Sequence, residues 1–186
     1  MMMLVHDKLR VGLATVHIPV AEIASKLSIG SVSKYISIMH QSLQHDFSIN
    51  SPKIAVLGLN PHAGDGGIIG DEEINIIAPA IEECQSGGLQ ITGPHPADGF
   101  FGNRKYEEYD GILAMYHDQG LIPFKTLSFG TGVNFTAGLP IIRTSPDHGT
   151  AFDIAGQNKA NPSSFNEAFT LAIQLADNRK NKLARQ

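Results

Sequence analysis

The chain has 186 residues, with 14 Lys and Arg against 18 Asp and Glu, and the charges behind its formal net charge of −4 are interspersed. This balance excludes the basic surface by which a protein binds nucleic acid or an anionic membrane. Cys84 is the only cysteine, which excludes an internal disulfide and a cysteine-based zinc site and fits a reduced, cytoplasmic setting.

Short apolar runs of strand character alternate along the chain with segments of helical spacing. The predicted strands cover residues 1–5, 10–16, 53–59, the first part of 88–97, 111–116 and, after a glycine-punctuated hairpin within 121–146, Leu139–Arg143. The predicted helices cover two segments within 19–47 that break near Gly30, then 72–84, and finally a helix from Ser163 or Ser164 to about Asn178. The basic tail 179–186 is expected to be frayed and solvated.

This alternation indicates an α/β sheet that is largely parallel with some antiparallel pieces. No apolar run approaches the roughly 20 residues that cross a bilayer. A chain of this length is expected to form one domain, residues 1–186, without an internal boundary. Its first residues look like a strand that begins in mid-sheet, so we expect the second part of a longer protein.

Three histidines share one local context, because each lies within a few residues of the carboxyl end of a predicted strand. His17 follows LRVGLATV, His62 follows KIAVLGL and His117 follows GILAMY. Ligands bind beyond the carboxyl ends of strands in open α/β sheets, so three imidazoles that converge there could hold a divalent ion. A single histidine at a strand end is more often a capping or hydrogen-bonding residue, and both interpretations stay open.

The loop NPHAGDGG, residues 60–67, joins a predicted strand to a predicted helix. Its glycines could let the backbone approach an anion at the helix start, but we favour a long turn that needs positive φ angles. The spacing matches neither GxGxxG nor a Walker loop, so those nucleotide-binding fingerprints are absent.

Three later residues are candidates for holding an anionic substrate, since Arg binds phosphate or carboxylate bidentately. They are Lys125, Asn134 and Arg143. The alternative is that each is a solvated edge residue. The segment SPDHGTAFDIAGQNKANP, residues 145–162, is longer and more polar than a connection requires, and long loops of this kind are usually functional.

Four motifs, ATVHIPV, GLNPHAGDGG, MYHDQGLIPFK and GLPIIRTSPDHGTAFDIAG, occur in order along essentially the whole chain. Together they resemble the 4-hydroxythreonine-4-phosphate dehydrogenases, the NAD-dependent family of pyridoxal phosphate biosynthesis. The stretch HGTAFDIAGQNKANP is also similar to the cofactor-binding loop of the isocitrate and isopropylmalate dehydrogenases. The resemblance implies their three-layer α/β/α fold. Because chains of the family are nearly twice this length, it also implies that the first half of that fold is missing.

The resemblance further implies roles for individual residues. The metal ligands would be His17, His62 and His117. The substrate would be held by Lys125, Asn134 and Arg143. The cofactor, NAD or NADP, would be bound by His148, Gly149, Thr150, Ala151, Asp153 and Asn161. Asp118 and Lys125 are the expected catalytic residues: Asp118 would orient an imidazole or reach the metal, and Lys125 would offset charge or donate a proton. The divalent metal would be Zn, Co, Mg or Mn, in an active site shared between two subunits of a homodimer.

The implied reaction is a metal-dependent oxidation of 4-phosphooxy-threonine by NAD(P), followed by decarboxylation to 3-amino-2-oxopropyl phosphate. Since half of the cleft would be absent, the chain alone is expected to be nearly inactive. Three alternatives stay open. The chain could belong to a related dehydrogenase of another hydroxy acid or a dihydrodiol, or be a non-catalytic domain that binds metal or phosphate. A metal-dependent hydrolase is the weakest alternative, because a hydrolase needs no dinucleotide loop.

Overall fold

A computed structural model describes residues 1–147 and 152–183 of the chain, and within them one mixed sheet takes up every strand. The strands are β1 (Met2–His6), β2 (Leu9–Leu13), β3 (Lys53–Leu57), β4 (Gln90–His95), β5 (Gly111–Ala114), β6 (Val133–Thr136) and β7 (Thr144–Pro146). Their order is β4-β3-β5-β2-β1-β6-β7. The ladders among β4, β3, β5 and β2 are parallel, whereas β1, β6 and β7 add on antiparallel. The sheet is therefore less parallel than the sequence predicts.

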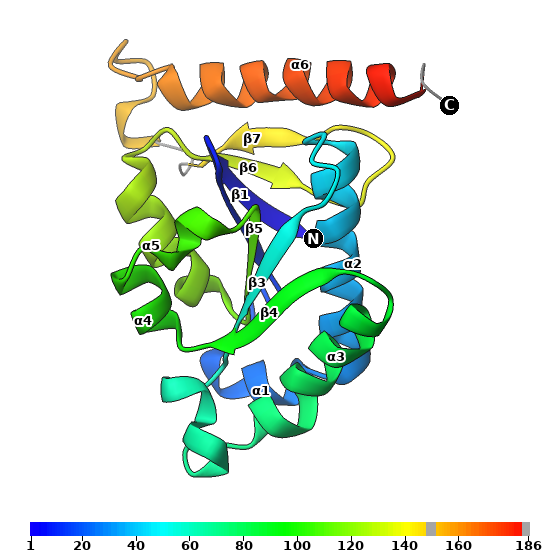
Figure 1. Cartoon of the computed structure of the whole chain (residues 1–186). Coiled ribbons are helices and arrows are strands. Elements are labelled where there is room, and N and C mark those ends of the chain that lie inside the picture. The colour runs from blue at the N-terminus through cyan, green and yellow to red at the C-terminus, as the bar shows by residue number, and fades with distance from the viewer. Residues whose placement is uncertain (148–151, 184–186) are drawn as a thin grey trace.

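Helices connect the strands and cover both faces of the sheet (Figure 1). They are α1 (Ile23–Lys26), α2 (Ile29–His45), α3 (Ala78–Ser86), α4 (Ala97–Gly102), α5 (His117–Ser128) and α6 (Ser163–Leu183). Shorter turns of helix lie at Val20–Glu22, Pro61–Gly67, Glu73–Ile77, Lys105–Glu108 and Phe152–Ile154. Within the described ranges, none of the helices combines the length and apolar character that a membrane span requires.

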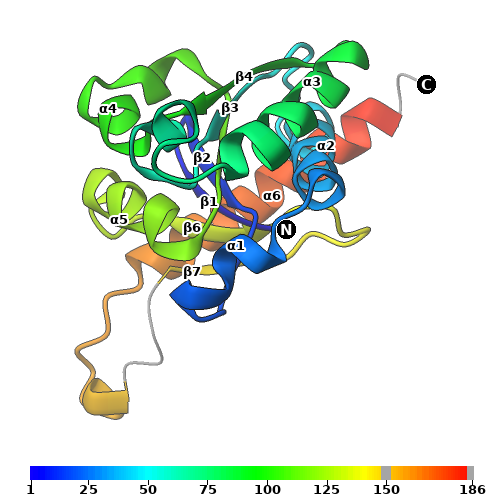
Figure 2. The same cartoon turned by 90° about the horizontal axis from the view of Figure 1, so that it is seen from below.

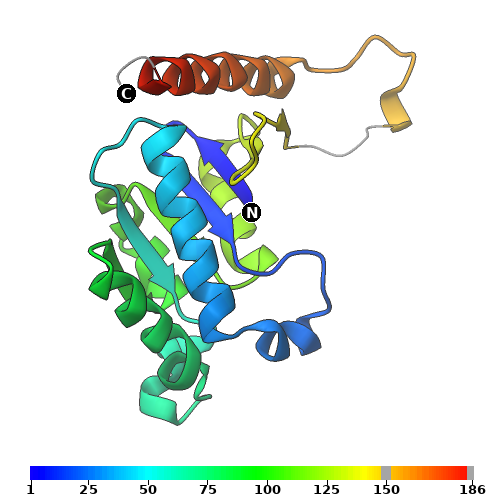
Figure 3. The same ribbon diagram turned by 90° about the vertical axis from the view of Figure 1, so that its right-hand side faces the viewer.

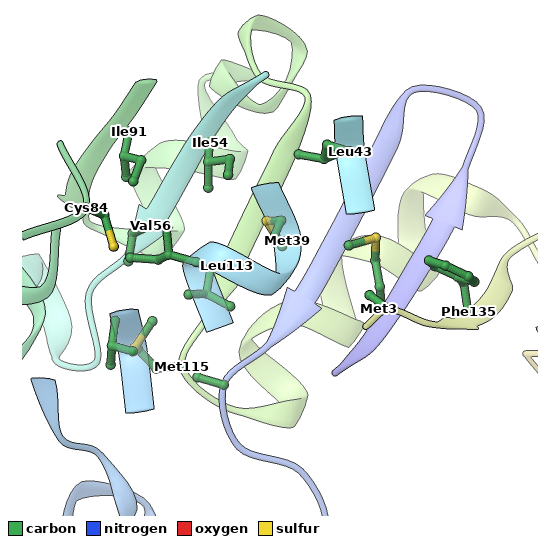
Figure 4. Packing of buried hydrophobic residues seen from close by; sticks show 14 of the residues in the cluster. Met3, Met39, Leu43, Ile54, Val56, Cys84, Ile91, Leu113, Met115 and Phe135 are labelled. Atoms are coloured by element: carbon green, nitrogen blue, oxygen red, sulfur yellow. The ribbon is translucent and has the colours of Figure 1, made fainter. Parts of the chain in front are cut away.

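Two hydrophobic cores lie on opposite faces of the sheet, which confirms the three-layer arrangement. Side chains alternate between faces along each strand, so Ile54 and Val56 of β3 join the core under α2 and α3, whereas Ala55 joins the core under α4 and α5. Figure 4 shows Met39 and Leu43 of α2 lying over the strands of the first core. A strand covered on both faces needs apolar residues at every position, which is why the predicted run 53–59 is continuously apolar.

The break between the first two helices lies before Gly30, where the sequence analysis had placed it. α1 ends at Lys26, and Ser28 caps α2. The Ser28 hydroxyl accepts a hydrogen bond from the Ser31 amide at 3.1 Å, and the Ser31 hydroxyl accepts one from the Ser28 amide at 2.9 Å. This reciprocal pair satisfies two backbone donors at the helix start, so serine chemistry rather than glycine sets the boundary.

The hairpin predicted within 121–146 forms only in the later part of that range, between β6 and β7, because residues 117–128 form α5. Leu121 and Phe124 point from this helix into the second core. A side chain at Gly120 would lie 2.7 Å from Leu13 of β2, so this glycine lets the helix pack closely on the sheet. Tertiary packing thus maintains a helix that glycine and Pro123 disfavour locally.

Two further predictions near the C-terminus need correction. The strand predicted at residues 139–143 is instead a hairpin turn, and β7 begins at Thr144. The tail predicted to fray from Arg179 continues α6 as far as Leu183. Arg179 is bound there, with its Nε 2.6 Å from Oδ1 of the buried Asp46. α6 lies along the β7 end of the sheet (Figures 1 and 3).

Candidate functional site

The three histidines singled out from the sequence follow β2, β3 and β5, which are adjacent parallel strands in the order β3-β5-β2. Their carboxyl ends therefore meet at one edge of the sheet, the position at which open α/β sheets bind ligands. Beyond the strands, Thr15 links the residues that follow β2 and β5. Its amide and its hydroxyl both donate to the carbonyl oxygen of Met115, at 3.1 and 2.7 Å.

His17 and His117 lie close together at this edge. Their ring centroids are 5.8 Å apart, and both line a cavity of about 220 Å³ that also includes Asp118. Nδ1 of His117 lies 2.7 Å from a carboxylate oxygen of Asp118. That contact occupies one ring nitrogen and leaves Nε2 of His117 as the nitrogen that can bind a ligand.

His62 lies in a left-handed turn, Pro61–Gly67, after β3. Six consecutive residues, 62–67, have positive φ angles, including 53° at His62, 52° at Ala63 and 44° at Asp65. The sequence predicts a turn with positive φ angles, but His62, Ala63 and Asp65 are not glycines, and for them the left-handed conformation costs about 1–2 kcal/mol each. Strain of this size persists only where the surroundings enforce it, and it is concentrated at functional sites.

Buried Glu73 holds the turn in this conformation. Its Oε1 accepts hydrogen bonds from the Leu59 and Asn60 amides, both at 2.7 Å, and its Oε2 accepts one from the Asn60 side chain at 2.9 Å. A side chain at Gly64 would come within 2.7 Å of Oε2 of Glu73, so the turn packs directly on this carboxylate. Glu73 is not among the residues predicted from the sequence, because a single Glu at the start of a helix is usually solvent-exposed.

Gln119 is a second residue that the sequence analysis left without a role. Its side-chain oxygen accepts a hydrogen bond from the Met115 amide at 2.7 Å, and its side-chain nitrogen donates one to the Gly58 carbonyl oxygen at 2.6 Å. It therefore ties the first turn of α5 to the ends of β5 and β3. The motif HDQG could have indicated this role, because in it polar residues follow directly after a buried strand.

The three histidines do not form a complete metal site within one chain. Among the described residues, no three His, Cys, Asp or Glu side chains gather closely enough to hold an ion. His17 and His117 come together, whereas His62 is exposed on the neighbouring turn.

A second, larger cavity of about 630 Å³ gathers Asn134 and Arg143 beside His17. Oδ1 of Asn134 is buried there without a hydrogen-bond partner among the described residues. Nη1 of Arg143 donates to the Thr136 hydroxyl at 3.0 Å, and Arg143 is an exposed residue. Lys26 of α1 also lines this cavity, and its sequence context gave no signal of that position. His17 lines both cavities, so the paired imidazoles and the cationic groups border one continuous region.

Lys125 is placed differently. It lies on α5 with its Nζ 3.5 Å from Oδ1 of Asp147, and its side chain is 53% exposed. It lines neither of the two cavities that contain His17. One chain therefore does not bring Lys125 together with Asn134 and Arg143.

The residues expected to bind the cofactor are only partly described. His148, Gly149, Thr150 and Ala151 lie outside the described residues. Asp153 is exposed in a segment that projects from the body of the molecule (Figure 2). Oδ1 of Asn161 accepts hydrogen bonds from the Ser163 amide at 2.9 Å and the Ser163 hydroxyl at 2.6 Å, so this side chain caps the start of α6.

Comparison with known proteins places these residues in a family. A family model described as pyridoxal phosphate biosynthetic protein PdxA matches residues 1–172. The chain is 52% identical over 184 residues to a 4-hydroxythreonine-4-phosphate dehydrogenase of Bacteroides thetaiotaomicron, covering 99% of this chain and 50% of the relative. A protein of the same name from Prosthecochloris aestuarii is 54% identical over 171 residues, covering 92% of this chain and 50% of that protein.

Solved structures agree. The chain matches the crystal structure of a 4-hydroxythreonine-4-phosphate dehydrogenase from Klebsiella pneumoniae with a TM-score of 0.85 and 45% identity, covering 94% of this chain and 53% of the other. It also matches a terephthalate 1,2-cis-dihydrodiol dehydrogenase from Burkholderia xenovorans with a TM-score of 0.75 and 32% identity, covering 93% and 55%. The chain spans about half the length of the curated relatives that it matches.

Proposed function

Because the chain belongs to the family of the pyridoxal phosphate biosynthetic protein PdxA, we propose that it supplies the metal- and substrate-binding part of a 4-hydroxythreonine-4-phosphate dehydrogenase. The observation that carries the proposal is the position of His17, which lines both the cavity of the paired imidazoles and the cavity of Asn134 and Arg143. A substrate with a hydroxyl and an anionic group could contact both sets of residues at once.

In the proposed reaction the hydroxyl of 4-phosphooxy-threonine is oxidised to a ketone, a hydride passes to NAD or NADP, and a proton is released. The carboxylate then leaves as carbon dioxide. Protonation of the resulting enolate yields 3-amino-2-oxopropyl phosphate. The nicotinamide cofactor accepts the hydride, so the task of the protein is to bind and orient the reactants and to offset their charge.

The donor atoms at the sheet edge fit a divalent ion. Imidazoles suit ions such as Zn²⁺ and Co²⁺, and the contact with Asp118 holds the His117 ring with Nε2 available. A bound ion of this kind would favour ionisation of the substrate hydroxyl and stabilise the later enolate as a Lewis acid. Two imidazoles come from one chain, and we propose that His62 comes from a second copy in a homodimer whose active site is shared.

The remaining side chains act on the charges of the substrate. Arg143 has guanidinium hydrogens free of its contact with Thr136 and would bind the phosphate or the carboxylate. The unpaired Oδ1 of Asn134 would accept a hydrogen bond from a hydroxyl or ammonium donor of the substrate. Lys125 keeps its two proposed roles, charge offset and proton donation to the enolate. Either role requires its ammonium to leave Asp147 or to serve the site of a second copy.

For the cofactor, the exposed carboxylate of Asp153 suits the hydroxyls of a ribose. Asn161 would contribute through its amide NH₂, since its oxygen already caps α6. His148, Gly149, Thr150 and Ala151 complete the proposed loop.

A second candidate function is a dehydrogenase of a dihydrodiol or another hydroxy acid. The likeness to the dihydrodiol dehydrogenase, at 32% identity over 93% of this chain, favours it over a hydrolase. A substitution of Arg143 distinguishes the two proposed dehydrogenase functions. Replacing it by Met should abolish turnover of a phosphorylated substrate, whereas turnover of a dihydrodiol without a carboxylate should persist.

The testing experiment combines metal analysis with NADH formation. We expect about one divalent ion per chain in the assembled site, and loss of the ion in the His17→Ala, His62→Ala and His117→Ala variants. His45→Ala, at the far end of α2, is the matched control and should keep the ion. The chain alone should form little NADH from 4-phosphooxy-threonine. A metal content that is unchanged in all three histidine variants would contradict the proposal.

A further inference from the structure

The cavity of about 630 Å³ beside His17 carries charge of one sign. Its lining includes two cationic side chains, Lys26 and Arg143, and no Asp or Glu among the described residues. A third positive group at this wall, the α-ammonium of Met1, donates to the Ala137 carbonyl oxygen at 2.9 Å. A cleft lined by one sign of charge attracts ligands of the opposite sign. The cavity therefore favours an anionic ligand.

The two cationic side chains have no carboxylate partner in the described part of the chain. Lys26 is an exposed residue in the last turn of α1 and takes part in none of the ion pairs there, and Arg143 donates to the neutral Thr136 hydroxyl. Lys125, by contrast, has its Nζ 3.5 Å from Asp147 and lines neither cavity that contains His17. Within one chain, Lys26 rather than Lys125 therefore places a second positive side chain beside Arg143.

A phosphate monoester needs more than one cation. It carries about 1.5–2 negative charges near neutral pH, so one guanidinium leaves part of that charge without a partner. The planar guanidinium of Arg143 suits two phosphate oxygens, and the ammonium of Lys26 acts as a compact point charge on a flexible stem. Tyr35 of α2 lines the same cavity, and its hydroxyl can donate to a phosphate oxygen. The charge at the wall thus matches a phosphate better than a single carboxylate.

From this charge balance we infer that Lys26 determines specificity for a phosphorylated substrate, because it holds the phosphate group together with Arg143. The inference rests on the proposed function, since it gives a place to the phosphate of 4-phosphooxy-threonine. The volume of about 630 Å³ is ample for such a molecule, because small-molecule sites measure about 300–1,000 Å³. His17 lines this cavity and the neighbouring one, so a substrate held at its phosphate can extend toward the paired imidazoles.

The test titrates the chain with inorganic phosphate in the presence of a chelator, so that no metal ion contributes to binding. The NMR shifts of the Asn134 and Thr136 amides, at the cavity wall, follow the titration. Lys26→Met should raise the Kd of phosphate about tenfold or more, as expected for the loss of a charge-assisted contact. Lys26→Arg keeps the charge and should retain most of the affinity.

Lys53→Met is the matched control. Lys53 is also exposed, but it begins β3 and so lies at the opposite end of that strand from the histidine edge. Its removal should change the Kd by less than about twofold, because salt screens a charge at that distance. Both lysines are exposed, so the melting temperatures of the variants should equal that of the unchanged chain.

An unchanged Kd in Lys26→Met overturns the inference, and so does the absence of saturable phosphate binding by the unchanged chain. An equal rise in Lys26→Met and Lys53→Met means that phosphate is an adventitious ion only, and overturns it too. Competition then identifies the source of the phosphate. 4-Phosphooxy-threonine should displace inorganic phosphate and NAD should not. Failure of the first, or displacement by the second, overturns the assignment of Lys26 to the substrate.

The proposed function fails by a different measurement. A metal content that stays unchanged in the histidine variants rejects the proposed metal site, whereas phosphate binding that depends on Lys26 still stands. Loss of the metal in those variants, with phosphate binding independent of Lys26, does the reverse.

Discussion

Glu73 shows how one buried carboxylate shapes the candidate site. It is 3% exposed and accepts three hydrogen bonds from Leu59 and Asn60, directly before the left-handed turn that carries His62. A left-handed turn with three non-glycine residues is unstable in isolation. The hydrogen bonds to Glu73 offset that cost and fix the direction in which His62 leaves the sheet.

Replacing Glu73 by Gln tests this role at the scale of one residue. The new amide NH₂ cannot accept a hydrogen bond, so at least one buried donor loses its partner. We expect the free energy of unfolding to fall by about 1–3 kcal/mol. Metal affinity should fall as well, because His62 loses its fixed position. Urea unfolding and a Co²⁺ titration measure the two effects.

Glu72→Gln is the control, since half-buried Glu72 accepts its hydrogen bond from the side chain of Asn60 alone. It should lose less than about 1 kcal/mol and keep its metal affinity. Equal effects of the two variants on stability and on metal affinity would contradict the assigned role of Glu73.

At the scale of elements, one ion pair fastens α6 to α2 and to the turn before β7. Nε of Arg179 lies 2.6 Å from the carboxylate of Asp46, and the two Nη atoms donate to the Pro140 and Leu139 carbonyl oxygens at 3.0 and 3.2 Å. Asp46 is only 3% exposed. Arg143 follows Pro140 a few residues later. The contacts of Arg179 therefore support both the last helix and the segment that carries this substrate-binding candidate.

Arg179→Met should destabilise the protein by about 2–4 kcal/mol, because it leaves the Asp46 carboxylate buried without a counter-charge. Lys180→Met, on the next and exposed residue of α6, should change stability by less than about 0.5 kcal/mol. Chemical denaturation of both variants measures the difference. Adding Asp46→Asn to the Arg179 variant should restore part of the lost stability. If the double variant is less stable still, the buried charge was not the cause.

For the whole molecule, the central feature is that the histidine side chains do not complete a metal site within one chain. His17 and His117 lie close together, whereas His62 is exposed on the neighbouring turn. Under the proposed homodimer, a second copy would supply the third imidazole.

Mixing two variants tests whether the metal site is shared between copies. Neither His62→Ala nor His117→Ala should bind the ion alone. In a mixed dimer, one of the two sites has His17 and His117 from one subunit and His62 from the other. Random pairing should therefore restore about a quarter of the wild-type metal content per chain. Elemental analysis after joint unfolding and refolding gives the value. No recovery, in a sample shown by mass spectrometry to contain mixed dimers, would contradict the assignment of His62 to a different subunit from His117.

The sequence by itself predicted most strands of the sheet and a candidate site at the carboxyl ends of three of them. The continuous apolar runs in 53–59 and 111–116 predicted strands buried on both faces, and the histidines after them predicted a ligand-binding edge of the sheet. Ser28 and Gln119 show where local signals existed but were misread or left unused. These features depend on spacing within a few residues, which a single sequence displays directly.

Only the tertiary structure decided how distant segments meet. It made 117–128 a helix despite Gly120 and Pro123, because close packing on β2 outweighs their local preference. It revealed the left-handed turn, whose strain a buried Glu73 offsets from the following helix. It also separated Lys125 from Arg143 and left Phe165 and Phe169 of α6 exposed. The physical reason is the same in each case. The deciding contact joins residues that are far apart in the chain, and the local periodicity of apolar residues does not reveal such a contact.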